Sequence, residues 1–217
     1  MDDRPTLVVV GAASRDIHAD DPRGWRLGGT APYASLVGAR LGVRVRALVG
    51  VDEMAATASE LEVLDDAGVE VELVPMDHGP VFDNQQTPAG RVQIVHSISD
   101  QIPASALPPA WRTPSAALLG PVAGELSDEW ASAFPRQTYV AIAAQGLVRA
   151  LVVGEPVETL PISSNALLSR ADVIAISAED VAGGAPPIQK LLPPRQEPVI
   201  PHNPQGALPL PLDGTSL

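Results

Sequence analysis

A pair of glycines between two apolar segments is the feature that most constrains how this chain folds. Gly28 and Gly29 precede a stretch with helical character, and the loop before them carries Asp16. Residues 7–10 upstream read as a buried strand, and residues 43–50 downstream read as the next one. Glycine lets a ligand approach a helix N-terminus, where unpaired N–H groups and the helix dipole favour oxygen-rich ligands. This order of elements predicts a small-ligand site in an α/β fold.

Strands and helices continue to alternate to about residue 200. Apolar residues at helical spacing predict a helix over residues 53–67, and residues 69–74 alternate as a half-buried strand. A β-α-β-α-β order gives a parallel sheet with right-handed crossovers. The remaining expected elements are strands at 115–121, 139–144 and 171–176, and helices at 127–134, with Ser127 as N-cap, and at 163–169.

Residues 77–99 interrupt this alternation. Two short segments, residues 80–84 and 90–96, are separated by turn residues and are predicted to pair as a hairpin. The hairpin either covers a ligand or is an ordinary surface feature. Its register decides whether Arg91 and Gln93 face the ligand or the solvent, and one sequence does not fix that register.

The composition excludes several classes of protein. A chain of 217 residues with 45% hydrophobic content suits one α/β domain with a substantial core. The net charge of −12 disfavours nucleic acid and anionic membranes as partners. The absence of cysteine excludes disulfides and thiolate nucleophiles, and no apolar run reaches the roughly 18 residues of a membrane span. The lack of cysteine and of a membrane span predicts a cytoplasmic protein. The four histidines lack ligand spacing, so no metal site is predicted.

Several short motifs occur in order over roughly residues 5–200. They are Gly11 with Asp16, Gly28-Gly29, Ala39-Arg40-Leu41-Gly42, Val49-Gly50-Val51-Asp52, Leu64-Asp65-Asp66-Ala67-Gly68-Val69, Thr87-Pro88-Ala89-Gly90-Arg91-Val92-Gln93 and Ala171-Asp172-Val173-Ile174. In their order and spacing, these motifs resemble the ribokinase-like (PfkB) carbohydrate kinase family. The resemblance implies a three-layer α/β sandwich with a mostly parallel sheet and a small β lid, formed by segments at about 13–30 and 77–99.

Intact members of this family transfer the γ-phosphate of ATP to a substrate hydroxyl, with Mg²⁺. The resemblance assigns Asp16 to accept hydrogen bonds from two vicinal sugar hydroxyls. It assigns Gly28 and Gly29 to contact the sugar, and Thr30 adds a hydroxyl. Taken without the resemblance, Asp16 also reads as a loop aspartate that caps a turn, and the glycines read as helix-entry geometry.

The other candidate substrate-binding residues each have two possible roles, one functional and one structural. Tyr33 stands where the family commonly has asparagine, so one amide contact to the substrate is lost, and the ring either stacks on a ligand or packs. Arg91 lies in the lid segment. Gln145 and Arg149 follow the C-terminal end of a predicted strand, where open α/β sheets bind ligands, although a surface turn is an equal reading.

On the phosphate side, the chain departs from the family. Ser177 and Asp180 replace both ends of an Asn-x-x-Glu motif that helps to organise magnesium and phosphate. If Asp180 helps to bind a metal ion, the shorter carboxylate would contact it through a bridging water. Alternatively, Asp180 is a negative charge at a helix N-terminus. Residues 201–206 replace an anion-binding turn, and the two prolines there have no N–H to offer phosphate. ATP and Mg²⁺ are therefore implied by the family and not by these residues.

The family's catalytic Gly-Ala-Gly-Asp motif does not occur in the 217 residues, so no catalytic residue is assigned. We expect a C-terminally incomplete domain over residues 1–185, followed by a poorly ordered, proline-rich tail over residues 186–217. An unpaired sheet edge would favour homo-oligomers. The expected function is that of a sugar or polyol kinase-like protein with a small polyhydroxylated substrate, inactive in phosphate transfer as this chain. The alternatives are a non-catalytic or vestigial ligand-binding protein and an unrelated enzyme that binds a nucleotide-sugar or a dinucleotide.

Overall fold

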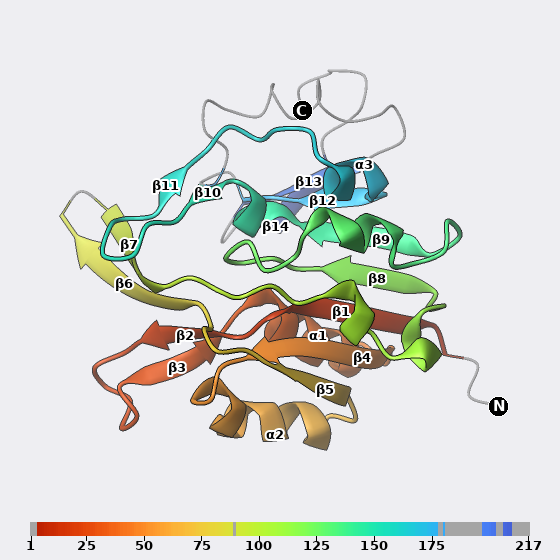
Figure 1. Cartoon of the computed structure of the whole chain (residues 1–217), viewed down its shortest axis with the longest axis horizontal. Helices are drawn as coiled ribbons and strands as arrows, with labels where there is room; N and C mark the ends of the chain where they lie inside the picture. The colour runs from red at the N-terminus through yellow and green to blue at the C-terminus, as the bar shows by residue number, and fades with distance from the viewer. Residues whose placement is uncertain (1–3, 89, 178–179, 181–196, 203–205, 210–217) are drawn as a thin grey trace.

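The fold was analysed in a computed structural model, which describes residues 4–88, 90–177, 180, 197–202 and 206–209 (Figure 1). A mostly parallel, eight-stranded sheet runs through it in the order β14-β13-β12-β9-β8-β1-β4-β5. Its neighbouring strands are parallel except β13 and β14, which confirms the predicted sheet. The strands are β1 (Thr6–Ala12), β4 (Arg44–Val51), β5 (Glu70–Pro75), β8 (Ala116–Leu119), β9 (Tyr139–Ala143), β12 (Val173–Ala175), β13 (Glu197–His202) and β14 (Gly206–Pro209).

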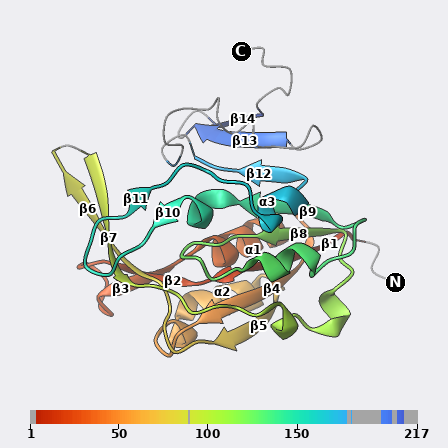
Figure 2. The same ribbon diagram turned by 45° about the horizontal axis from the view of Figure 1, so that its top comes forward.

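Both faces of the sheet are buried. Successive side chains of a strand point to opposite faces, and in β1 Val9 joins one core cluster while Val8 and Val10 join the other. The Val9 cluster includes side chains of α1 (Thr30–Arg40), α2 (Ser59–Asp66) and the first short 3₁₀ turn, η1 (Ala55–Thr57). The second cluster includes side chains of α3 (Ala166–Arg170) and of the other four 3₁₀ turns. Figure 2 shows the three helices around the sheet. The 3₁₀ turns are η1 (Ala55–Thr57), η2 (Ala104–Ala106), η3 (Pro109–Trp111), η4 (Asp128–Ser132) and η5 (Ala144–Leu147). None of the described helices is long and apolar enough to cross a membrane.

Two helix predictions need correction. The helix expected over residues 127–134 is the short 3₁₀ turn η4, and the Ser127 side chain makes no capping hydrogen bond. Pro135 follows closely and disfavours helical backbone at the residue before it, which leaves too few residues for an α-helix. The helix expected over residues 53–67 is divided into η1 and α2, because Ala58 has extended backbone (φ −71°, ψ 126°).

A second sheet of four strands lies at one end of the main sheet, in the order β3-β2-β6-β7 (Figure 1). Strands β6 and β7 pair as the predicted antiparallel hairpin, and β2 lies parallel to β6 and antiparallel to β3. We call this sheet the lid. Its strands are β2 (Ser14–Ile17), β3 (Trp25–Gly28), β6 (Val81–Thr87) and β7 (Gly90–Ser97).

A loop from the main domain runs along the outer strand of the lid. It contains the short antiparallel pair β10 (Arg149–Ala150) and β11 (Glu158–Thr159). The amide of Val157 donates to the carbonyl of Gln93 at 2.7 Å, and the amide of Gly154 donates to the carbonyl of Val95 at 2.8 Å. These bonds hold the β10–β11 loop against β7.

The segment expected to be a poorly ordered tail, residues 186–217, contains two strands. Strand β13 pairs in parallel with β12, and β14 returns antiparallel to β13. Pro198 and Pro201 both lie within β13. Sheet pairing on either side of these prolines outweighs their low strand propensity. The rest of the segment, including most of its prolines, lies outside the described residues.

Candidate ligand-binding site

A cavity of about 230 Å³ lies where the lid meets the start of α1 and the turn after β9. It is open to solvent on one side, and its lining is mainly polar. Eight of its lining residues are ones that the sequence pattern indicated: Asp16, Gly29, Thr30, Tyr33, Arg91, Gln93, Gln145 and Arg149. The other three are Ser14, Phe82 and Val122. Segments far apart in the sequence therefore line one cavity.

The diglycine positions the start of α1 against the lid. A Cβ atom on Gly28 would lie 2.6 Å from Oδ2 of Asp16, so only glycine lets the Asp16 carboxylate sit there. Gly29 has φ 99°, in the left-handed region that favours glycine, and a Cβ on it would overlap the carbonyl oxygen of Ala12. Gly29 lines the cavity, whereas Gly28 lies behind Asp16 and does not belong to the lining.

Asp16 presents a largely uncommitted carboxylate to the cavity. Among the described residues the donor to it is Ser14, whose hydroxyl lies 3.4 Å from Oδ1. Burial raises the pKa of Asp16, while the Ser14 hydrogen bond and the charges of Arg91 and Arg149 act in the opposite direction. The carboxylate thus retains acceptor capacity for ligand hydroxyls, and both arginines are close enough to influence it.

Strand β7 turns Arg91 and Gln93 toward the cavity, which answers the question of register. They are two residues apart and so share a face, and Asn84 lies opposite Gln93 on β6. Oδ1 of Asn84 accepts hydrogen bonds from Nη2 of Arg91 at 2.6 Å and from Nε2 of Gln93 at 2.9 Å. Asn84 therefore orients both side chains.

Arg149 lies opposite the lid, at the start of β10, and its side chain is 10% exposed. Its Nη2 lies 3.5 Å from Oδ1 of Asp180, a long ion pair. Its Nε is buried and has no hydrogen-bond partner within the described part of the chain. Burial lowers the pKa of Arg149, and the neighbouring Asp180 opposes that change.

Ser177 and Asp180 lie beside the cavity without lining it. The Ser177 hydroxyl donates to Oδ2 of Asp180 at 2.6 Å, and Nε2 of Gln145 lies 3.2 Å from the same oxygen. With Arg149 at Oδ1, each oxygen of this carboxylate already faces a protein donor. Asp180 therefore orients two lining side chains and does not fit a direct magnesium ligand. Whether a helix begins at Asp180 lies outside the described residues.

The sequence interpretation missed one charged residue beneath the site. Glu125 is fully buried, and its carboxylate accepts hydrogen bonds from the backbone amides of Ala12 at 2.9 Å, Val122 at 3.0 Å and Ala123 at 2.8 Å. Burial raises its pKa, and these amides act in the opposite direction. It joins the end of β1 to the loop that carries Val122. An acidic residue within an apolar, glycine-containing loop after a buried strand was the available signal.

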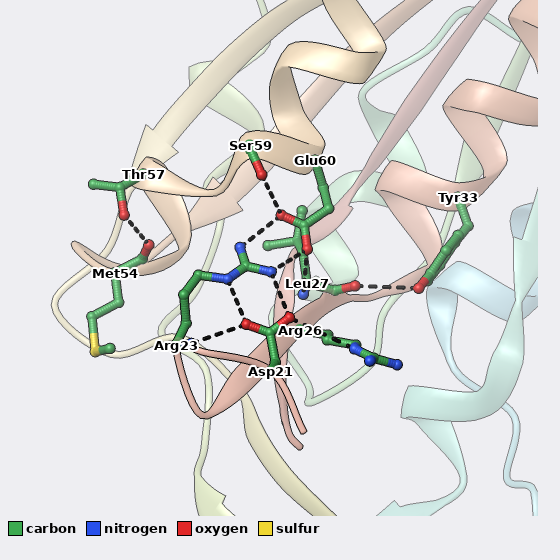
Figure 3. Close-up of polar contacts among 9 residues, drawn as sticks. All are labelled: Asp21, Arg23, Arg26, Leu27, Tyr33, Met54, Thr57, Ser59 and Glu60. Atoms are coloured by element: carbon green, nitrogen blue, oxygen red, sulfur yellow. Dashed lines mark hydrogen bonds and ion pairs between the residues drawn. The ribbon is translucent and has the colours of Figure 1, made fainter. Parts of the chain in front are cut away.

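Tyr33 lies at the rim of the cavity. Its side chain is one of the exposed ones, at 62%, and its hydroxyl donates to the carbonyl of Leu27 at 3.2 Å (Figure 3). The ring is thus held between α1 and the end of β3, with one face left to solvent or ligand.

Two ion pairs tie the lid to the main domain. Nη2 of Arg15 in β2 lies 2.7 Å from Oδ2 of Asp52, at the end of β4. Arg23, in the β2–β3 loop, bonds to Asp21 at 3.0 Å and to Glu60 of α2 at 2.6 Å (Figure 3). The guanidinium of Arg23 also stacks 4.6 Å from the ring centre of Trp25. The lid wall of the cavity is therefore fixed relative to the sheet.

No model of a known protein family matches the sequence, and no curated protein matches it. Solved structures do share its fold. A pyrophosphate-dependent kinase in the ribokinase family, solved with a pyrophosphate analog and myo-inositol, superposes with a TM-score of 0.73 at 18% identity, covering 96% of this chain and 76% of that one. A fructokinase from Vibrio cholerae O395, bound to fructose, ADP and potassium ion, gives a TM-score of 0.62 at 15% identity, with 98% and 75% covered.

The tetrameric inhibited form of phosphofructokinase-2 from Escherichia coli also superposes, with a TM-score of 0.56 at 12% identity, over 95% of this chain and 76% of that one. All these identities are low, so the likeness concerns the fold. The chain has the ribokinase-like fold, as the order of its sequence motifs implied.

Proposed function

We propose that this chain, with its ribokinase-like fold, is a sugar or polyol kinase-like protein that binds a small polyhydroxylated ligand in the cavity. The observation that carries the proposal is the convergence of Asp16, the Gly29–Thr30 turn and the lid residues Arg91 and Gln93 on one cavity. The family resemblance implies substrate contacts for Asp16, Gly29 and Thr30, and it places Arg91 and Gln93 in the lid segment. Structures that share the fold include kinases solved with myo-inositol and with fructose, which supports the same class of ligand.

The chemistry of the lining suits a ligand rich in hydroxyls. Asp16 is an acceptor for two vicinal hydroxyls, since an ionised carboxylate has two oxygens with several lone pairs. Thr30, Gln93 and Gln145 add neutral groups that both donate and accept. Gly29 and Thr30, where α1 begins, line the same space, and the Gly29 N-cap makes no side-chain capping hydrogen bond. Such a set of short polar contacts orients a polyol.

Phosphate transfer is the less supported part of the function. One kinase that shares the fold is pyrophosphate-dependent and another was solved with ADP, and the family resemblance implies ATP and Mg²⁺ for this chain. Ser177 and Asp180 do not fit a direct metal or phosphate site, because they bond to one another and to the cavity residues. The 217 residues also lack the Gly-Ala-Gly-Asp motif to which the resemblance assigns the base. We propose that the 217-residue polypeptide binds its ligand without transferring phosphate, which leaves a purely ligand-binding role as the second candidate.

Calorimetry with myo-inositol and D-glucitol tests the binding proposal. Asp16→Ala should weaken binding by about 1.5–3 kcal/mol, the range of a hydrogen bond to a charged group. Asp20→Asn, at an exposed position of the β2–β3 loop, is the matched control and should bind like the unmodified chain. Equal affinity in the Asp16 variant would reject Asp16 as the anchor. Release of phosphorylated polyol from ATP or pyrophosphate would reject the absence of transfer.

The setting of the protein is also part of the proposal. We place it in the cytoplasm, in line with its lack of cysteine and its acidic charge.

We propose homo-oligomers formed through a strand edge, because unpaired edges favour association and a structure of the same fold is a tetramer. Light scattering after size-exclusion chromatography measures the molar mass, and a monomer at all concentrations would contradict this.

A further inference from the structure

The charge of the cavity differs from the charge of the molecule. The chain carries a net charge of −12, yet the charged residues that line the cavity are one carboxylate, Asp16, and two guanidinium groups, Arg91 and Arg149. Their charges interact, because both arginines oppose the effect of burial on Asp16. A neutral polyol would need Asp16 but would leave two cations facing the ligand.

Of the two arginines, Arg149 is the one with buried hydrogen-bond donors that need an acceptor. Its side chain is nine-tenths buried, and a guanidinium carries five N–H donors. Within the described residues its one ion pair is the 3.5 Å contact with Asp180, and its Nε has no partner. Asp180 does not compensate fully, because the same carboxylate accepts from Ser177 and from Gln145 at shorter distances. A buried cation with unused donors is costly unless an anion completes its contacts.

Arg91 reinforces the positive charge from the opposite wall. Oδ1 of Asn84 accepts from two of its nitrogens, so the guanidinium is held in place on the lid. Among the described residues, no carboxylate forms an ion pair with it. The positive charge of Arg91 also contributes to lowering the pKa of Arg149, so two like charges lie near each other. An oxyanion between them would relieve that repulsion.

We infer that the cavity selects a polyol that bears an acidic group, a carboxylate or a phosphate, whose oxygens contact Arg149 and face Arg91 while its hydroxyls bond to Asp16. This inference rests on the proposed function, since it takes Asp16 as the hydroxyl anchor. Arginine suits the role because its planar fork matches the oxygens of carboxylate and phosphate. The ligand class is therefore a sugar acid or sugar phosphate, and a neutral sugar lacks the group that Arg149 requires.

The experiment compares matched ligands by calorimetry on the full 217-residue chain. The probes are D-glucitol, which is neutral, D-gluconate and D-glucitol 6-phosphate, which add an acidic group, and inorganic pyrophosphate alone. The proteins are the unmodified chain, Arg149→Gln, Arg149→Lys and the control Arg40→Gln, at an exposed position at the end of α1. Thermal unfolding of each variant shows whether it is folded.

At least one acidic polyol should bind the unmodified chain about tenfold or more tightly than D-glucitol, the scale of a hydrogen bond to a charged group. Arg149→Gln should remove most of that preference while D-glucitol affinity stays within about threefold. Arg149→Lys keeps the charge without the fork, so it should retain part of the preference, and Arg40→Gln should retain all of it. If Arg149→Gln does not fold, the lysine variant and the unmodified chain still decide.

Several results would overturn the inference. Equal affinity for neutral and acidic polyols would do so and would leave the proposed function intact. A preference that persists in a folded Arg149→Gln protein would place the anion elsewhere. Binding of pyrophosphate that depends on Arg149 and leaves D-glucitol bound, with no advantage for acidic polyols, would assign the arginine to a separate anion. Failure of every polyol to bind would instead reject the proposed function, and this inference with it.

Discussion

Glu125 is the residue whose role the sequence concealed most completely. It stands in a loop that reads as apolar, yet its carboxylate is the common acceptor for three backbone amides from two parts of the chain. Buried amides without partners are costly, so these donors need the acceptor that Glu125 supplies. Through the Val122 amide the same carboxylate positions a lining residue of the cavity.

Glu125→Gln should destabilise the protein by about 1–3 kcal/mol, because the glutamine NH₂ group would face backbone N–H donors and leave at least one of them unsatisfied. Urea unfolding measures the change. Glu72→Gln, on the exposed side of β5, is the control and should remain within about 0.5 kcal/mol of the unmodified chain. Unchanged stability in Glu125→Gln would show that the amides find other acceptors.

Gly29 and Gly24 distinguish two reasons for glycine at positive φ, backbone strain and steric overlap of a Cβ atom. Both adopt left-handed backbone, with φ 99° and 77°, but a Cβ on Gly24 meets nothing within 4 Å, whereas one on Gly29 overlaps the Ala12 carbonyl. Gly24→Ala should therefore cost about 1–2 kcal/mol of unfolding free energy from backbone strain alone. Gly29→Ala should cost more and should also weaken polyol binding, since the overlap displaces the start of α1. Thermal unfolding and calorimetry would contradict this if the two variants behaved alike.

At the scale of elements, the ion pairs of Arg23 form a polar staple between the lid and the main domain. Arg23 joins the β2–β3 loop to α2 by contacts with Asp21 and Glu60. The hydrogen bonds from Arg23 lower the pKa of Glu60 to about 2 and that of Asp21 to about 2 as well. Both carboxylates are exposed enough for solvent and salt to weaken these contacts. The staple therefore sets the position of the lid more than the stability of the whole domain.

The pH dependence of this staple has a definite sign. A carboxylate whose pKa is lower in the folded state than in the unfolded state stabilises the fold above its ordinary pKa, near 4.5 for Glu60. That contribution is lost as the pH falls from about 4.5 toward the folded value of about 2. Salt should reduce it. Unfolding measured from pH 6 to pH 2 should therefore show a shallower acid loss in Arg23→Gln, and parallel curves for the two proteins would contradict the assignment.

The sequence predicted the elements of the lid but not their arrangement. The hairpin over β6 and β7 was predicted because both strands and their turn are local. The parallel pairing of β2 with β6 joins residues more than 60 positions apart, and no local pattern encodes it. The register that turns Arg91 and Gln93 toward the cavity also depends on a cross-strand partner. That partner is Asn84, which bonds to both side chains.

At the scale of the whole molecule, the sequence did not predict the order in which the strands lie in the sheet. Buried valines identified β1 as a core strand, but its place between β8 and β4 follows from crossovers that bring distant strands together. The many prolines from residue 186 onward predicted little regular structure. Local propensity carries no information about distant strands, so it did not indicate that β13 pairs with the edge of β12. Asp16 and the diglycine were predicted as a site because strand, loop and helix are contiguous there, whereas Glu125 contacts a strand 113 positions away.

The position of each strand in the sheet gives a last prediction, for hydrogen exchange. Strand β1 pairs on both sides and its Val8, Val9 and Val10 are fully buried, so exposing its amides requires two ladders and the core to open. Among the described residues, strand β14 lies at the edge of the sheet and pairs with β13. Amides of residues 206–208 should exchange orders of magnitude faster than those of residues 8–10. Strand β5, at the other edge but in contact with α2, serves as the control and should exchange at an intermediate rate. Protection of β14 equal to that of β1 would mean that the C-terminal strands unfold together with the central sheet.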